Sequence, residues 1–509
     1  MKRALISVSD KRDLIEFAKG LVRNNFEIIS TGGTEKSLKE AGIPTINISD
    51  ITGFPEIMDG RVKTLHPNVH GGLLCVRDNP EHLEALNRNS IELIDLVVVN
   101  LYPFKETLKK EGVSHEELIE NIDIGGPSML RSAAKNHKFV TVCVDPSDYP
   151  KVIYEIETLG DTAQETKSLL AAKVFRHTAA YDTLISNYLS ERSGEKFPES
   201  YTVTFEKVQN LRYGENPHQE AAFYRNSFAG FSLVNSKQLN GKELSYNNIQ
   251  DSNAALEILK EFDEPAVVAV KHMNPCGVAL GTDLFSAWKK AYAADPVSIF
   301  GGIVAVNRTV DGDVAREMAE LFLEVIIAPS YTDEALEILS KKKNLRVLFL
   351  NMDATVLNKK RVVTVNDGAL LQDLDLEKLN LDDLKCVTER EPTEMEIADL
   401  LFAWKVVKHV KSNAIVIGKS GQTLGVGAGQ MNRVGSAGIA LNQSGDNSVG
   451  AVMASDAFFP MADSVELAAK YGITAIIQPG GSIKDQLSID ECNRHGIAMI
   501  FTGMRHFKH

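Results

Sequence analysis

Short apolar runs alternate with amphipathic stretches through the first 150 residues, and this alternation constrains the fold more than any other feature. The helical stretches are Asp10–Leu21, Thr34–Ala41 and Pro127–Asn136. The runs typical of strands are Ala4–Val8, Glu27–Ser30, Thr45–Ile48, Leu93–Asn100 and Phe139–Val144. The last two are nearly continuous in apolar residues, as expected for strands buried on both faces of a parallel sheet. The pattern predicts an α/β domain of the layered Rossmann type.

A domain boundary is expected shortly before residue 200. A helical stretch covers Gln164–Leu189, and the polar segment Ser190–Ser200 after it has no apolar periodicity and contains glycine and proline. We therefore expect a first domain of residues 1–195, with a layered core over about residues 1–150, followed by a second region of residues 196–509.

The second region repeats one arrangement of apolar runs. The first series is Ala266–Val270, Ser298–Val306, Val325–Pro329 and Leu345–Leu350. The second series is Ala414–Gly418, Gly450–Phe459, Ala475–Pro479 and Ile497–Phe501, and corresponding members lie about 150 residues apart. This spacing predicts a duplicated α/β region with units over about residues 200–360 and 394–509, although unrelated buried strands can also resemble one another.

The charge balance argues against a nucleic-acid or membrane partner. The formal net charge of −13 disfavours non-specific attraction to nucleic acid or anionic lipid. A nucleotide would therefore need a pocket in which basic groups are concentrated. No apolar run approaches the roughly 18 residues of a membrane span, and the apolar start of the chain is too short for a signal peptide.

The cysteines indicate neither a disulfide framework nor a zinc site. There are five, they are scattered along the chain, and no C-x-x-C pair occurs. We expect a cytoplasmic protein without a metal site.

Loops at the expected strand ends of the first domain carry residues suited to phosphate binding and proton transfer. STGGT (Ser30–Thr34) follows a strand and opens a helix, so its glycines and the helix N-terminus suit an oxyanion. Ser9 and Lys11 follow another strand at the same edge. The motifs RVKTLHP, NLYPF and IDIGGPSMLRSAAKNH add further Lys, Tyr, Asp and Gly residues. A tight turn, packing or surface charge also explains each motif alone, and no P-loop occurs.

The motif KHMNPCG (Lys271–Gly277) is the sharpest signal in the second region. A basic and a titratable group at a strand end can stabilise an oxyanion and transfer a proton, although a surface Lys beside a packed His is the ordinary explanation. LRYGENPHQ favours a binding loop over an ordinary turn. GVGAGQMNR does not meet the dinucleotide fingerprint. SDAFFP could hold a flat heterocycle or pack in a core.

Two alternative functions follow from the same residues. A zinc nucleoside deaminase needs P-C-x-x-C, but Pro275–Cys276 is followed by Gly, Val and Ala, so this alternative fails. A nucleotide-binding sensor would keep the phosphate loops, yet it need not keep Lys271, His272 and Asn413 together. Turnover of substrate separates the sensor from an enzyme.

Eleven sequence blocks, in this order along the whole chain, resemble the family of bifunctional AICAR transformylase/IMP cyclohydrolases. They are SVSDK, STGGT, RVKTLHP, NLYPF, DIGGPSMLRSAAKNH, LRYGENPHQ, KHMNPCG, SNAIV, GVGAGQMNR, SDAFFP and RHFKH. The resemblance implies formyl transfer from 10-formyltetrahydrofolate, the co-substrate, to AICAR (an aminoimidazole carboxamide ribonucleotide). Cyclisation of formylated AICAR to inosine monophosphate (IMP) follows, completing de novo purine biosynthesis.

The resemblance also implies the fold and the residues of each site. The first domain would be a methylglyoxal-synthase-like cyclohydrolase and the second a duplicated cytidine-deaminase-like transformylase. The implied catalytic residues of the cyclohydrolase are Lys63, Tyr102, Asp123 and Lys135. Its implied substrate-binding residues are Ser9, Lys11, Ser30, Thr31, Gly32, Gly33, Thr34, Arg61, Thr64, Asn100, Gly125 and Gly126.

For the transformylase, the implied catalytic residues are Lys271, His272 and Asn413. Residues implied to bind substrate are Arg212, Tyr213, Phe458 and Arg505, and those implied to bind folate are Phe300, Gly301, Pro460 and Asp463. The resemblance further implies a homodimer with transformylase sites at its interface, and no tightly bound cofactor. This chain has Met461 and Ala462 where the animal members have Phe and Arg, and it lacks their extra loops.

Overall fold

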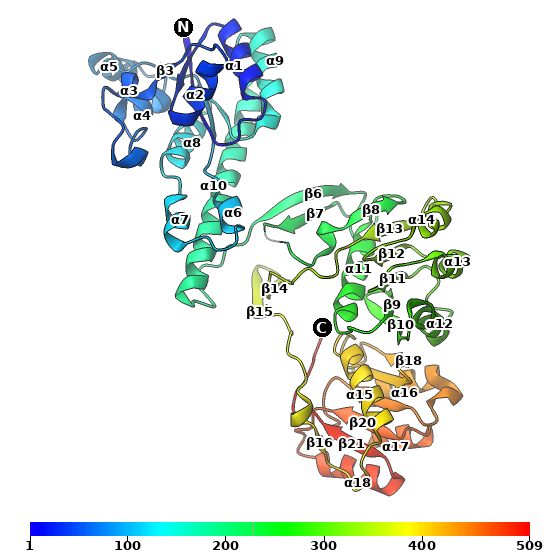
Figure 1. The fold of residues 1–509 in the computed structure, drawn as a ribbon. Helices are drawn as coiled ribbons and strands as arrows, with labels where there is room; N and C mark the ends of the chain where they lie inside the picture. Colours follow the sequence, from blue (N-terminus) through cyan, green and yellow to red (C-terminus); the bar gives the residue numbers. More distant parts are fainter. Residues whose placement is uncertain (228) are drawn as a thin grey trace. The chain divides into compact units, whose positions relative to one another are not determined.

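The structure is a computed structural model that describes residues 1–227 and 229–509. The described residues divide into two compact units, Met1–Thr204 and Phe205–His509 (Figure 1). The boundary expected from the sequence followed residue 195. Over the described residues, no helix is both long and apolar enough to span a membrane.

The first unit is built on a parallel sheet, here called the first sheet, whose described strands run in the order β3-β2-β1-β4-β5. Their bounds are β1 Lys2–Val8, β2 Phe26–Ser30, β3 Ile46–Asn47, β4 Leu96–Asn100 and β5 Thr141–Cys143. All five apolar runs of the first domain therefore form strands, as predicted. The strand order reverses at β1, so a crevice opens between the carboxyl ends of β1 and β4, where doubly wound sheets bind ligands.

Helices connect these strands and cover the first sheet. They are α1 Leu14–Arg23, α2 Gly32–Glu40, α3 Ile48–Thr52, α4 Pro67–Leu74, α5 Pro80–Arg88, α6 Phe104–Leu108, α7 His115–Glu120, α8 Gly125–Lys135, α9 Tyr149–Leu159 and α10 Gln164–Ser193. The long helix α10 buries Leu170, Val174 and Tyr181 in the same core as β4 and β5, which makes it part of this unit.

The second unit is built on one mixed sheet, here called the large sheet. Its described strands run in the order β16-β21-β20-β19-β17-β18-β10-β9-β11-β12-β13-β8. Their bounds are β8 Lys237–Asn240, β9 Ala266–Lys271, β10 Asn274–Leu280, β11 Ile303–Val306, β12 Val325–Ala328, β13 Arg346–Phe349, β16 Lys385–Cys386, β17 Ile415–Lys419, β18 Gln422–Gly427, β19 Val452–Ser455, β20 Ala475–Gln478 and β21 Ala498–Phe501. Two hairpins lie outside it, β6 Phe205–Leu211 with β7 Ala221–Asn226, and β14 Lys360–Val365 with β15 Gly368–Asp373.

Helices cover both faces of the large sheet. One face carries α11 Tyr246–Leu259 and α15 Glu394–Val407, which share a core with alternate strand residues such as Val268 and Val416. The strand residues that face the other side of the sheet, such as Val267 and Ile415, form two further cores with the remaining helices. Those helices are α12 Leu284–Ala294, α13 Gly312–Glu320, α14 Asp333–Ser340, α16 Arg433–Ser444, α17 Asp463–Lys470 and α18 Asp485–His495.

The strand order confirms the predicted duplication. From β10 outward the order is β10-β9-β11-β12-β13, and from β18 outward it is β18-β17-β19-β20-β21. In both series a hairpin is followed by an antiparallel and then by parallel neighbours. The two halves meet where β10 pairs with β18. The sequence prediction missed β10 and β18 because both contain glycine and directly follow a turn.

Equivalent glycines allow each half to pack a helix closely on its hairpin. A Cβ added at Gly277 would lie 2.2 Å from Ala291 O of α12, and one added at Gly425 would lie 2.0 Å from Ala440 O of α16. Both distances are far below van der Waals contact, so a side chain at either glycine would push the helix away from its strand.

We therefore predict that Gly277→Ala and Gly425→Ala each destabilise the second unit by about 1–3 kcal/mol. Gly438→Ala is the matched control, because its Cβ would lie 3.8 Å from Leu467 Cδ2 inside a helix that alanine favours. Both tryptophans of the chain, Trp288 and Trp404, are buried in this unit, so their fluorescence during urea unfolding measures it alone. Equal stability of all three variants would contradict the close-packing argument.

Candidate functional site

A cavity of about 550 Å³ lies in the first unit at the carboxyl ends of β1 and β4, the crevice expected from the strand order. It brings together most of the residues selected for this unit from the sequence. They are Ser9, Lys11, Thr31, Gly32, Gly33, Thr34, Arg61, Lys63, Thr64, Asn100, Tyr102, Asp123, Gly125 and Gly126. These residues come from five separate segments, so the fold itself assembles the site.

Backbone groups form one side of this cavity. Helix α2 begins at Gly32, whose φ of +44° favours glycine, and α8 begins at Gly125. Both helix N-termini therefore lie at the cavity, where their N–H groups suit an anion such as phosphate. The Thr34 and Asn100 side chains bond to protein backbone instead, because Thr34 Oγ1 accepts from Val8 N at 3.0 Å and Asn100 Oδ1 accepts from Ser9 N at 2.7 Å. These two side chains shape the pocket wall.

Charged and titratable groups form the other side. The half-buried Lys63 ammonium lies 3.4 Å from Glu56 Oε1. Burial raises the pKa of Asp123, although hydrogen bonds from the Gly126 and Tyr102 N–H groups and the nearby Lys63 oppose this effect. The Gly126 N–H donates to Asp123 Oδ1 at 2.8 Å. A carboxyl group with a raised pKa is suited to exchange protons closer to neutral pH.

Two residues selected for this site lie elsewhere. The Ser30 side chain is fully buried and its hydroxyl donates to Ile6 O at 2.8 Å, so its side chain belongs to the core rather than to the ligand site. Lys135 is the last residue of α8, ten residues from Gly125 and therefore about 15 Å along the helix, and it is exposed. The sequence alone could not predict that Lys135 lies at the end of α8 that is away from the cavity.

The second candidate site lies at one edge of the large sheet. Lys271 ends β9, and the next two residues form a two-residue turn into β10. Lys271 Nζ donates to Phe300 O at 2.8 Å, so Lys271, Phe300 and the following residue Gly301 lie close together. His272 is exposed, so its imidazole is accessible to a ligand.

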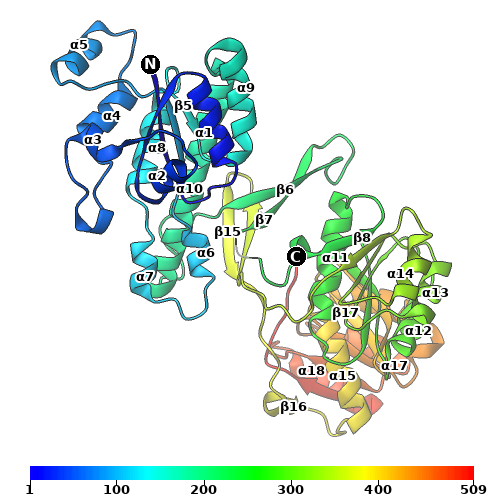
Figure 2. The ribbon, with the colours of Figure 1, turned by 45° about the horizontal axis from the view of Figure 1, so that its top comes forward.

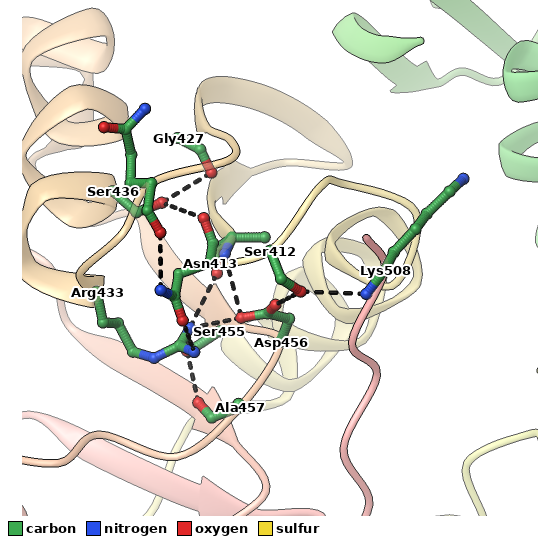
Figure 3. Close-up of polar contacts among 11 residues, drawn as sticks. Ser412, Asn413, Gly427, Arg433, Ser436, Ser455, Asp456, Ala457 and Lys508 are labelled. Carbon is green, nitrogen blue, oxygen red and sulfur yellow. Dashed lines mark hydrogen bonds and ion pairs between the residues drawn. The ribbon is translucent and has the colours of Figure 1, made fainter. Parts of the chain in front are cut away.

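Asn413 lies at the same edge, since it precedes β17 and Ile415 pairs with both Gly427 and Ser455. A hydrogen bond links the two halves here, from Lys411 N to Asn274 Oδ1 at 3.2 Å. The Asn413 amide is held at both ends: Oδ1 accepts from Arg433 Nη2 at 2.7 Å, and Nδ2 donates to Gln430 O at 2.7 Å (Figure 3).

Arg433 binds this amide and Asp456 pairs with Arg433, and neither residue was predicted from the sequence to belong to the site. The buried Arg433 guanidinium forms an ion pair with the fully buried Asp456 carboxylate and also donates to Ser455 Oγ at 2.9 Å. Ser412 Oγ donates to Asp456 as well (Figure 3). The sequence feature that could have pointed to Arg433 is its position directly after Asn432, the N-cap of α16.

The C-terminal residues and the end of β19 complete this edge. His506 N donates to Asp456 O at 3.0 Å, and Lys508 N donates to Ser412 Oγ at 3.1 Å. The selected residues Arg505, Phe458, Pro460 and Asp463 are all exposed, whereas Phe459 is fully buried. The FF pair of SDAFFP is therefore split between surface and core.

Arg212 and Tyr213 follow β6 on a loop, where the exposed Arg212 guanidinium lies 5.7 Å from the centre of the Tyr213 ring. Cys276 is a packed thiol of β10, and burial raises its pKa to about 12.

Comparisons with known proteins show the family of this chain. The family model described as AICARFT/IMPCHase bienzyme matches residues 133–443, and the MGS-like domain model matches residues 13–128. The chain is 62% identical over 509 residues to proteins of Bacillus cytotoxicus and Bacillus cereus named bifunctional purine biosynthesis protein PurH, covering 100% of each chain. The crystal structure of ForH matches with 36% identity and a TM-score of 0.34, over 37% of this chain and 98% of that one. The chain belongs to the AICARFT/IMPCHase bienzyme family.

Proposed function

We propose that the chain catalyses formyl transfer from 10-formyltetrahydrofolate to the 5-amino group of AICAR, and then cyclises the product to IMP. The observation that carries this proposal is the convergence of distant segments on two separate places, the cavity of the first unit and the edge of the large sheet that holds Lys271, His272 and Asn413. Full-length identity to the PurH proteins supports the same pair of reactions.

Formyl transfer is assigned to the second unit. The AICAR amine donates its lone pair into the imidazole ring and is a poor nucleophile, so a base must remove its proton during attack. His272 is accessible for this role, and Lys271 would stabilise the oxyanion that forms on the formyl oxygen when the amine nitrogen bonds to the formyl carbon. The bond from this carbon to the folate nitrogen then breaks, and tetrahydrofolate leaves with a proton on that nitrogen. Because Arg433 and Gln430 hold both ends of the Asn413 amide, Asn413 would contact the formyl oxygen through its remaining N–H rather than orient His272.

Cyclisation is assigned to the first unit. The carboxamide nitrogen attacks the formyl group within one molecule and water leaves, so holding the two groups together contributes much of the rate, about 7–11 kcal/mol in favourable cases. The N-termini of α2 and α8 suit the phosphate and the tetrahedral oxygen. Lys63 would stabilise the same oxygen, while Tyr102 and Asp123 move protons. The position of Lys135 does not support a role in this cavity.

The co-substrate and the cellular setting follow from the same assignment. The exposed Phe300, Phe458 and Pro460 suit the flat pterin ring of a folate. Four of the five cysteines are buried and all five are free, which fits a reducing compartment, so we assign the protein to the cytoplasm.

We further propose a homodimer, formed in part by the β14–β15 hairpin. Figure 2 shows this hairpin, in which β15 is labelled. Val363 and Leu370 are paired across it and are 39% and 60% exposed. Isolated two-stranded hairpins are marginal in water, and exposed apolar patches mark interaction sites. A second copy of the chain would cover this hairpin and bring its own residues to the transformylase edge.

His272→Ala should lower the rate of formyl transfer by about 10²–10⁴-fold, because the base is lost. Cyclisation of added formyl-AICAR should stay within twofold of the original rate, since the other cavity is intact. Separate assays of tetrahydrofolate release and IMP formation measure the two effects. An equal loss of both activities in the folded variant would contradict the assignment.

Lys63→Met should give the opposite pattern, a loss of about 10²–10³-fold in cyclisation with formyl transfer preserved. Lys36→Met is the matched control, because this lysine lies on α2 of the same unit with its side chain 78% exposed. Normal cyclisation by the Lys63 variant would refute the proposed role.

Leu370→Lys should shift the chain from dimer towards monomer, because a charge on the hairpin face opposes its burial. Sedimentation equilibrium measures the mass relative to the 55.9 kDa chain. Ile483→Lys, a change at an equally apolar but fully exposed position, should leave the mass unchanged. If the unsubstituted chain is a monomer, the dimer proposal is wrong.

A further inference from the structure

The turn that presents His272 is an unfavourable one for its sequence. His272 and Met273 have φ angles of +53° and +61°, in the left-handed region where two-residue hairpin turns favour Asn and Gly. Such conformations persist only when the surrounding structure holds them in place. The contacts around this turn therefore determine where the imidazole lies.

The duplicated half contains the same turn with ordinary turn residues. Ser420 and Gly421 connect β17 to β18 with φ angles of +53° and +66°. Lys419 precedes them as Lys271 precedes His272, and its ammonium donates to Val449 O at 2.8 Å as Lys271 donates to Phe300 O. The duplication has thus kept the backbone and the lysine, whereas a histidine occupies only the first turn.

One aspartate supports each turn from the helix on the same face of the large sheet. Asp251 of α11 accepts from Met273 N at 2.7 Å. Asp399 of α15 accepts from Ser420 N at 2.8 Å and from Gly421 N at 2.9 Å. The two carboxylates occupy equivalent places, so the bond from helix to turn is a retained element of the architecture.

We propose that Asp251 is a positioning residue for formyl transfer, which holds the His272–Met273 turn so that the imidazole meets the AICAR amine. This inference rests on the proposed function of the second unit. The bond between a carboxylate and an N–H group is a strong, directional one, and Met273 packs against the core beside it. The turn is thereby fixed from two sides, with His272 left exposed between them.

Burial raises the pKa of Asp251, and this is opposed by the N–H groups of Met273 and His272 and by the His272 imidazole. Replacing the Asp251 side chain by the methyl group of alanine would remove the acceptor from the Met273 N–H group. A displacement of about 1 Å at a reacting group can cost on the order of 10²-fold in rate. The loss should therefore appear in the chemical step.

The test compares Asp251→Ala with Asp399→Ala in the full-length chain. We expect Asp251→Ala to lower kcat for formyl transfer by about 10–100-fold with less than a threefold change in KM for AICAR, because Asp251 does not contact the substrate. Asp399→Ala removes the equivalent bond and should leave kcat within twofold. Cyclisation should be unchanged in both variants, and tryptophan fluorescence should report a similar loss of stability in each.

Asp251→Asn separates positioning from a general structural effect. The Asn side chain keeps an oxygen that can accept from Met273 N, so this variant should retain more kcat than Asp251→Ala. If the alanine variant does not fold, the comparison of Asp251→Asn with Asp399→Asn applies the same criterion.

Three results would overturn the inference: an unchanged kcat in Asp251→Ala, an equal loss of kcat in Asp399→Ala, or an asparagine variant no better than alanine. Failure of the proposed function is distinguishable from all three, because then the original chain would show no formyl transfer.

Discussion

The pairing of β10 with β18 is the interaction on which the arrangement of the second unit depends. These strands join the two duplicated halves through the antiparallel pair Ala279 and Gln422, and through hydrogen bonds from Val278 N to Thr423 Oγ1 at 3.0 Å and from Leu280 N to Gly421 O at 2.8 Å. Because the pairing is antiparallel, the turn after β9 and the start of β17 lie at the same edge. A lysine–histidine pair and an asparagine that are distant in sequence thereby become neighbours.

The two candidate sites differ in the chemical groups that they offer to a substrate. The first unit offers helix N-termini and cations around a cavity, which suits an intramolecular reaction that needs mainly orientation. The second unit offers an exposed imidazole, an ammonium group and a fixed amide at an open edge, which suits the proposed transfer between two substrates. The buried ion pair of Arg433 with Asp456 is costly to desolvate, and it holds the guanidinium that binds the Asn413 amide.

The sequence predicted the parts of the fold that depend on local pattern. Every apolar run of the first domain became a strand, and both series of the second region did so in matching order. Glycine-rich β18 could not be recognised, because its glycines serve the close approach of α16 and this contact is tertiary. Motifs likewise singled out Lys271 and Asn413, whereas the partners of the Asn413 side chain, Gln430 and Arg433, come from another segment that no local pattern connects to it. Ser30 was selected as a ligand residue but its side chain is fully buried, because a loop motif does not indicate which of its side chains point into the core.

The most direct test of the central claim is a coupled assay of the purified chain with AICAR and 10-formyltetrahydrofolate, following tetrahydrofolate and IMP together. Two working sites on one chain predict that both products form in equal amounts at completion. Tight binding of the nucleotide without either product, as a nucleotide sensor would give, would contradict the account.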